Sequence, residues 1–89
     1  MNERLILSTI AFVEITIWKL AKPLEGSGHR YKYRMAYVVD DVCVLRFDNE
    51  AGKGDHKHLD EVEVSYGFTD LETLQADFWI EVNRRRKRS

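Results

Sequence analysis

The strongest constraint on the fold is an alternation of apolar and polar side chains on both sides of Asp40-Asp41. A two-residue repeat is typical of β-strands, because successive side chains of a strand point to opposite faces. The two aspartates predict a hairpin turn between antiparallel strands, with positive φ at both turn positions. We interpret one face of residues 31–39 as core rather than as a surface for stacking bases. That face consists of Tyr31, Tyr33, Met35, Tyr37 and Val39.

The returning strand, residues 42–48, also divides its side chains between two faces. These faces consist of Val42, Val44, Arg46 and Asp48, and of Cys43, Leu45 and Phe47. Its cysteine is flanked by valines, so we expect Cys43 to be a buried, inert core residue. As the single cysteine of the chain, it excludes an internal disulfide and fits a reducing compartment.

Two further stretches of the chain predict strands. Residues 4–20 contain neither glycine nor proline and suit two strands or one long bent strand, with a helix as the alternative. Residues 59–68 alternate again, and we expect Val62, Val64 and Tyr66 to point inward. The clearest break is residues 23–28, PLEGSG, and the histidine that follows it, His29, is expected at the surface without a partner.

The last part of the chain predicts one helix. Thr69 and Glu72 match a capping box, in which an N-cap hydroxyl and a carboxylate three residues later satisfy two backbone amides. The helix should run to about residue 85, with an apolar stripe of Leu71, Leu74, Phe78 and Val82. The expected fold is therefore a single α+β domain over residues 1–89. It contains an antiparallel sheet of about four to five strands, with one C-terminal helix packed on a face.

Charge and hydropathy limit the function classes. The 89 residues are 44% hydrophobic, which suffices for one core, and no signal peptide or membrane span is predicted. We therefore expect a cytoplasmic protein that has no membrane partner. The basic tail, residues 84–88, holds five of the 14 lysines and arginines, so residues 1–83 are acidic. The tail could complement the helix dipole, bind phosphates or bind an acidic partner.

The segment with the most titratable chemistry is residues 48–58, DNEAGKGDHKH. His56 and His58 are two residues apart, so in an extended segment both rings lie on one face. If the segment folds back on the preceding strand, Arg46 and Asp48 could converge with them. Such a segment can equally be a solvated connector. It is not a phosphate-binding loop, because the GxxxxGK[ST] spacing is absent.

Three chemistries would use these residues. In the first, one histidine takes a proton from a ribose 2′-hydroxyl, a second acid protonates the leaving 5′-oxygen, and Arg46 or Lys53 stabilises the phosphorane. In the second, His56 and His58 bind a divalent metal together with Asp48 or Asp55. In the third, Asp55-His56-Lys57 forms part of a Mg²⁺ nuclease site. We expect Asp55 or Asp48 to orient the ring of His56, the stronger of the two candidates.

The ordered set of motifs resembles the TumE family of small toxins from about residue 17 to residue 86. Its most specific part is an aromatic-Asp-Asn sequence, here Phe47-Asp48-Asn49, which is followed by the run from Gly52 to His58. Three further stretches carry the resemblance, namely residues 17–20, 23–38 and 66–79. The basic end completes it.

This resemblance implies the toxin of a toxin–antitoxin system, which a helix-turn-helix antitoxin binds and silences. For a toxin of this size we expect a metal-independent endoribonuclease without cofactor, with RNA as substrate and a His/Lys/Arg site. The predicted catalytic residues are His56, His58, Lys53, Arg46, Asp48 and Asp55. The alternatives are a non-catalytic binding module and a nuclease with a divalent metal at His56, His58 and Asp55. A homodimer and a toxin–antitoxin hetero-oligomer both remain open.

Overall fold

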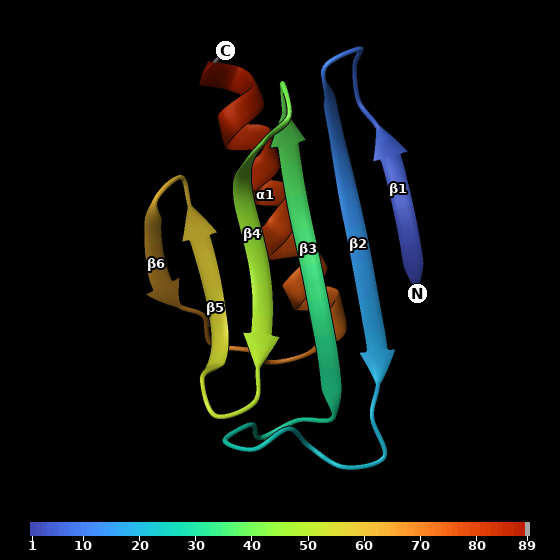
Figure 1. Ribbon diagram of the computed structural model, residues 1–89, viewed down its shortest axis with the longest axis vertical. Helices are drawn as coiled ribbons and strands as arrows, with labels where there is room; N and C mark the ends of the chain where they lie inside the picture. Colours follow the sequence, from blue (N-terminus) through green and yellow to red (C-terminus); the bar gives the residue numbers. More distant parts are fainter. Residues whose placement is uncertain (89) are drawn as a thin grey trace.

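A computed structural model describes residues 1–88 and the side chains of residues 1–87. It contains one six-stranded antiparallel sheet, in which strands that follow one another in sequence are also neighbours in space, and one helix (Figure 1). The elements are β1 (Asn2–Ile6), β2 (Ala11–Lys19), β3 (Tyr31–Val39), β4 (Val42–Glu50), β5 (Gly54–Leu59), β6 (Val62–Ser65) and α1 (Leu71–Arg88). No helix within the described residues is both long and apolar enough to span a membrane.

The expected α+β class, with an antiparallel sheet and a C-terminal helix, is confirmed. The number of strands is six rather than four to five. One reason is that residues 4–20 form parts of two strands, β1 and β2. The other is that most of the segment 48–58 is strand, because β4 continues to Glu50 and β5 begins at Gly54.

The turn at Asp40-Asp41 forms as predicted. Its two residues have φ values of 50° and 65°, the left-handed region that this type of two-residue hairpin requires and that aspartate tolerates better than most residues. The strands on either side pair directly beyond it, with Val39 opposite Val42.

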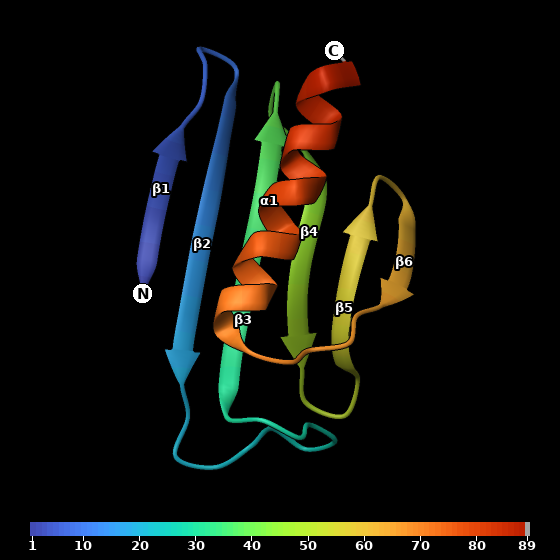
Figure 2. The same cartoon turned by 180° about the vertical axis from the view of Figure 1, so that it is seen from behind.

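The core lies between the sheet and the helix. Figure 2 shows α1 crossing β3 and β4 on one side of the sheet, which we call the covered face. The other side, called the open face, has no helix on it within the described residues (Figure 1). Three helical side chains from the predicted stripe are fully buried against the covered face, which confirms that stripe: Leu74, Phe78 and Val82. The sheet contributes Val13, Ile15, Ile17, Tyr33, Met35, Tyr37, Leu45 and Phe47.

The helix does not reach the β6 edge of the sheet. Val62 and Val64 belong to the covered face but are 60% and 36% exposed, so the expectation that they are buried is wrong. Alternation in a strand specifies which side chains share a face. The position of the helix determines which of these side chains are buried. Tyr66, beyond the strand, is half-buried and its ring packs against Phe47.

An irregularity between β3 and β4 changes the face of one residue. The register shifts at Tyr37/Val38, so that Leu45 opposes Tyr37 while Cys43 opposes Val38. A β-bulge adds one unpaired residue and interrupts strict alternation. Cys43 is therefore exposed, contrary to expectation, and Val44 packs against the core instead.

The helix begins one residue later than its sequence suggested. The N-cap is Asp70, whose Oδ1 accepts a hydrogen bond of 2.7 Å from the backbone amide of Thr73. Thr69 is not the cap. The amide hydrogen bonds lower the pKa of Asp70, because they favour its charged form. At the other end the helix continues to Arg88, so the basic tail forms its last turns rather than a separate segment.

Candidate active site on the open face

The hairpin of β4 and β5 brings four of the predicted site residues together. Asp48 is the partner of His56 in the strand register, and Arg46 is the partner of His58. All four side chains therefore lie on the open face, since paired residues of antiparallel strands share a face. Gly52 and Gly54 have φ values of 77° and 81°, and glycine adopts this backbone conformation without strain.

Arg46 fixes the tautomer of His58. Its Nη2 lies 3.0 Å from His58 Nε2, and a guanidinium can only donate hydrogen bonds. His58 Nε2 must therefore accept, which places the ring proton on Nδ1. Arg46 Nε is 3.2 Å from Asp48 Oδ2, an ion pair that lacks hydrogen-bond geometry. The other oxygen of Asp48 lies 3.7 Å from His58 Nε2.

The Nε2 atom of His56 is more available to a substrate than the Nε2 atom of His58. Its Nδ1 is 3.0 Å from the carbonyl oxygen of Gly54, and a carbonyl can only accept, so Nδ1 carries the proton. Its Nε2 faces Glu63 Oε1 at 3.8 Å, beyond hydrogen-bond distance. The lone pair of His56 Nε2 is therefore not engaged by any described residue, whereas that of His58 is occupied by Arg46.

Glu63 is the residue that the sequence did not identify as part of the site. It lies on β6 opposite His58, and its Oε1 is 3.8 Å from the Nε2 of each histidine. The alternation of residues 59–68 already placed Glu63 on the face opposite to Val62 and Val64. The residue of β5 that lies opposite Glu63 could not be predicted from the sequence, because the length of the β5–β6 turn sets that register.

Lys53 joins the cluster from the β4–β5 turn. Its Nζ is 2.8 Å from Glu63 Oε1. The hydrogen bond from Lys53 lowers the pKa of Glu63, and the same bond raises the pKa of Lys53, so both groups are charged near neutral pH. The open-face cluster thus consists of Arg46, Asp48, Lys53, His56, His58 and Glu63.

Asp55 lies on the opposite side of the sheet. It neighbours His56 in sequence and therefore points to the covered face, where its Oδ2 accepts hydrogen bonds from Tyr33 Oη at 2.7 Å and His29 Nε2 at 2.8 Å. The expectation that it orients the ring of His56 is wrong. Burial, followed by this hydrogen bond, raises the pKa of Tyr33 and keeps its hydroxyl a neutral donor.

His29 is half-buried and has partners for both ring nitrogens. Its Nδ1 accepts from the backbone amide of Tyr31 at 3.1 Å, so Nε2 carries the proton that is donated to Asp55. The ring stacks on Phe68 with centroids 3.8 Å apart. The expectation of a partnerless surface residue is wrong, and two of the partners of the side chain, Asp55 and Phe68, are too distant in sequence for a local pattern to indicate them. With both nitrogens engaged, His29 ties the loop after β2 to the β4–β5 hairpin.

Of the two predicted sets of metal ligands, the set with Asp48 shares the open face, whereas the set with Asp55 does not. His56 and His58 lie on the open face and Asp55 on the covered face, so these three cannot bind one ion in this arrangement. Within residues 1–88, no group of three or more His, Cys, Asp and Glu side chains is placed to hold a metal ion.

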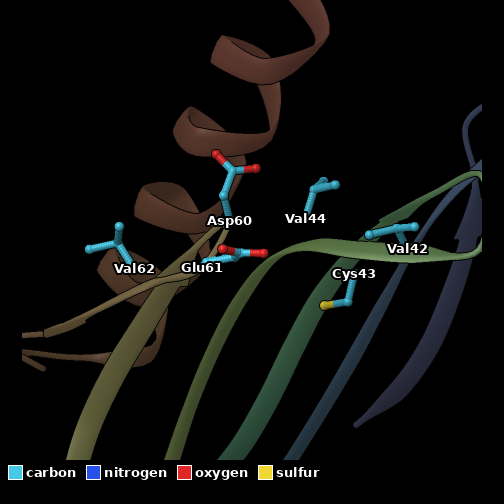
Figure 3. Close-up of a pocket in the computed structure, with 6 residues that line it drawn as sticks. All are labelled: Val42, Cys43, Val44, Asp60, Glu61 and Val62. Carbon is cyan, nitrogen blue, oxygen red and sulfur yellow. The ribbon is translucent and has the colours of Figure 1, made fainter.

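Two other features lie away from the cluster. An open hollow of about 380 Å³ is lined by residues at the start of β4 and the β5–β6 turn (Figure 3). It contains none of the predicted site residues. The basic tail also lies at this end of the molecule, on the covered side of the sheet, while the β4–β5 turn that carries Lys53 is at the far end (Figures 1 and 2). Within the tail, Arg84 pairs with Glu81 and Arg85 with Asp60.

Fold and site together define a small α+β protein that carries a cluster of imidazoles, cations and carboxylates on an uncovered sheet face. The model of the family described as "Toxin TumE" matches residues 3–86, nearly the whole chain. The chain therefore belongs to the TumE toxin family, as the sequence motifs indicated. Membership in a toxin family also suggests an antitoxin partner. No curated protein and no solved structure matched the chain.

Proposed function

We propose that this TumE toxin is a metal-independent endoribonuclease whose active site is the open-face cluster. The observation that supports this most is the position of the two imidazoles. Both Nε2 atoms face the same carboxylate oxygen of Glu63 at 3.8 Å. They are therefore less than about 8 Å apart, close enough to flank one phosphodiester and act as a proton-transfer pair.

The two histidines have different roles in this proposal. His56 Nε2 is free to take the proton of a ribose 2′-hydroxyl, and the resulting 2′-oxygen attacks the adjacent phosphorus. His58 in its protonated form gives a proton to the 5′-oxygen as the P–O5′ bond breaks. The products are a 2′,3′-cyclic phosphate and a 5′-hydroxyl, and the next proton exchange with water restores both histidines.

The charged residues of the cluster support these roles. Arg46 is bound to His58 in the free protein, and a substrate phosphate is the stronger acceptor for a guanidinium. Transfer of Arg46 to the phosphate would free His58 Nε2, which lies 3.7 Å from Asp48 and 3.8 Å from Glu63. Lys53 would add a second cation to the phosphorane.

We also propose that the antitoxin partner is a helix-turn-helix protein that silences the toxin by covering this site. The support is the motif set over residues 17–86 and the open position of the cluster, which a bound protein can reach without displacing α1 (Figure 1). The silenced form would be a toxin–antitoxin hetero-oligomer.

The test is cleavage of RNA and DNA by purified protein, together with growth arrest when the toxin is expressed without antitoxin. His56→Ala and His58→Ala should each lower the cleavage rate by about 10²- to 10⁴-fold and abolish growth arrest. Lys57→Ala is the matched control, since Lys57 stands between the two histidines but belongs to the covered face.

Circular dichroism should show that all three variants are folded. If both histidine variants are folded and fully toxic, the catalytic proposal is wrong and a binding module remains. If cleavage requires an added divalent metal, the metal-dependent alternative replaces the proposed mechanism.

A further inference from the structure

The open face continues from the cluster toward β2 and β3 with a different set of side chains. Arg34 on β3 is the register partner of Asp48, so it lies directly beside the cluster. Lys32, two residues earlier on the same face, is the partner of Trp18 on β2. These three residues, Trp18, Lys32 and Arg34, form what we call the platform.

Trp18 is unusually exposed for its type. Half of its surface is accessible to solvent, although tryptophan on average is highly buried. It belongs to the face that no helix covers, so the fold does not use its ring for the core. An exposed aromatic side chain on a sheet surface is the usual support for an unstacked base.

The two cations of the platform are not neutralised by carboxylates. Arg34 is exposed and has no ion-pair partner among residues 1–88, and the ammonium of Lys32 donates to the carbonyl oxygen of Asn49. By contrast, the nearest carboxylate of β2 on this face, Glu14, is paired with Arg4 at 3.3 Å. Asp48, the register partner of Arg34, is paired with Arg46 instead.

We propose that the platform binds single-stranded RNA, with one base stacked on Trp18 and backbone phosphates held by Lys32 and Arg34. This inference rests on the proposed ribonuclease function, because it takes the RNA strand to continue from the scissile phosphate at His56. It goes beyond that function by assigning a binding surface outside the catalytic cluster.

The spacing suits a short run of nucleotides. Trp18 on β2 and His56 on β5 are separated by three strand spacings of about 4.8 Å each and, at right angles to these, by two residues of about 3.4 Å each, a straight-line distance of roughly 16 Å. Arg34 lies between them, next to Asp48. An RNA strand that passes from the cluster across β4 and β3 would therefore contact Arg34 and Lys32 before it reaches the ring of Trp18.

The experiment uses a short oligoribonucleotide with 2′-O-methyl groups, which cannot be cleaved because its 2′-oxygen cannot attack. The chain has two tryptophans, and Trp79→Phe leaves Trp18 as the only one. Titration of Trp79→Phe with this oligonucleotide should quench Trp18 emission in a saturable manner. In the wild-type background, Trp18→Ala should weaken binding by about 5- to 150-fold, the range for loss of one stacked base. Trp18→Phe should restore most of it.

Arg34→Ala should weaken binding and lower the slope of log affinity against log salt by about one. Lys57→Ala is its matched control, because Lys57 is a cation on the covered face, outside both the platform and the basic tail. An equal effect of Lys57→Ala and Arg34→Ala would overturn the proposal, since binding would then follow charge anywhere on the surface.

Cleavage of unmodified RNA is measured in parallel to separate this inference from the proposed function. Quenching and the Trp18→Ala effect without any cleavage would support the platform and refute the ribonuclease. Cleavage with neither quenching nor a Trp18→Ala effect would overturn the platform and leave the ribonuclease standing. Quenching by the purified antitoxin but not by the oligonucleotide would also overturn it, because the platform would then bind protein.

Discussion

Replacement of Asp55 by alanine should destabilise the protein strongly, because two buried donors depend on this carboxylate. Its side chain is only 10% exposed, and its Oδ2 accepts from both Tyr33 Oη and His29 Nε2. A hydrogen bond to a charged group contributes about 1.5–3 kcal/mol, and a buried donor that loses its partner pays its own desolvation cost. We therefore expect Asp55→Ala to lower the free energy of unfolding by about 3–5 kcal/mol. That is a large part of the ~5–15 kcal/mol typical of a domain.

Urea denaturation followed by circular dichroism measures this loss. Glu61→Ala is the matched control, an exposed carboxylate in the β5–β6 turn, and should change stability by less than about 0.5 kcal/mol. Tyr33→Phe removes one of the two donors, and the cycle of Tyr33→Phe with Asp55→Ala should show a coupling energy above about 0.5 kcal/mol. If Asp55→Ala lowers the free energy of unfolding by less than about 1 kcal/mol but abolishes activity, our structural assignment of Asp55 is refuted. Asp55 would then be a catalytic residue, as the sequence suggested.

Three further predictions concern the charged residues at the edges of the fold. Because Lys53 lowers the pKa of Glu63, their stabilising contact is complete above the unfolded pKa of Glu63, about 4.3, and is lost as pH falls through its lower folded pKa. Lys53→Met should therefore lower the urea midpoint near neutral pH but not at a pH low enough to protonate Glu63 in the folded protein, and a pH-independent difference would contradict this. Asp70→Ala should lower the thermal midpoint and Thr69→Ala should not, since only Asp70 caps the helix; the reverse order would restore the capping box. Deletion of residues 84–88 should lower stability by about 1 kcal/mol or less and weaken RNA or antitoxin binding, and unchanged binding at all salt concentrations would show that the tail has no binding role.

The local patterns of the sequence predicted most of the fold. Alternation in residues 31–39 placed Tyr33 and Met35 in the core, and the turn at Asp40-Asp41 followed from the same pattern. These features depend on neighbours along one strand, and the sequence contains that information directly. The face of the sheet that carries Arg46, Asp48 and the two histidines was predictable for the same reason.

The features that sequence reasoning missed depend on contacts between distant residues. His29 and Asp55 are 26 positions apart, and no local pattern indicates that they form a hydrogen bond. Glu63 reaches the histidines only because the turn after β5 sets its register. Cys43 changed face through a bulge, whose position depends on the packing of two strands rather than on either one. The error on Asp55 was different, because it did not depend on a distant contact. Alternation along the strand already indicates that the side chains of Asp55 and His56 point to opposite faces.

The most direct test of the ribonuclease mechanism is the chemistry of the RNA ends after cleavage by purified toxin in excess EDTA. Our account predicts fragments with 2′,3′-cyclic phosphate and 5′-hydroxyl ends, because the 2′-oxygen is the nucleophile and His58 protonates the 5′-oxygen. Mass spectrometry of a short synthetic RNA identifies both ends in one measurement. Fragments with 3′-hydroxyl and 5′-phosphate ends, or a folded toxin that cuts no RNA in EDTA, would contradict the account.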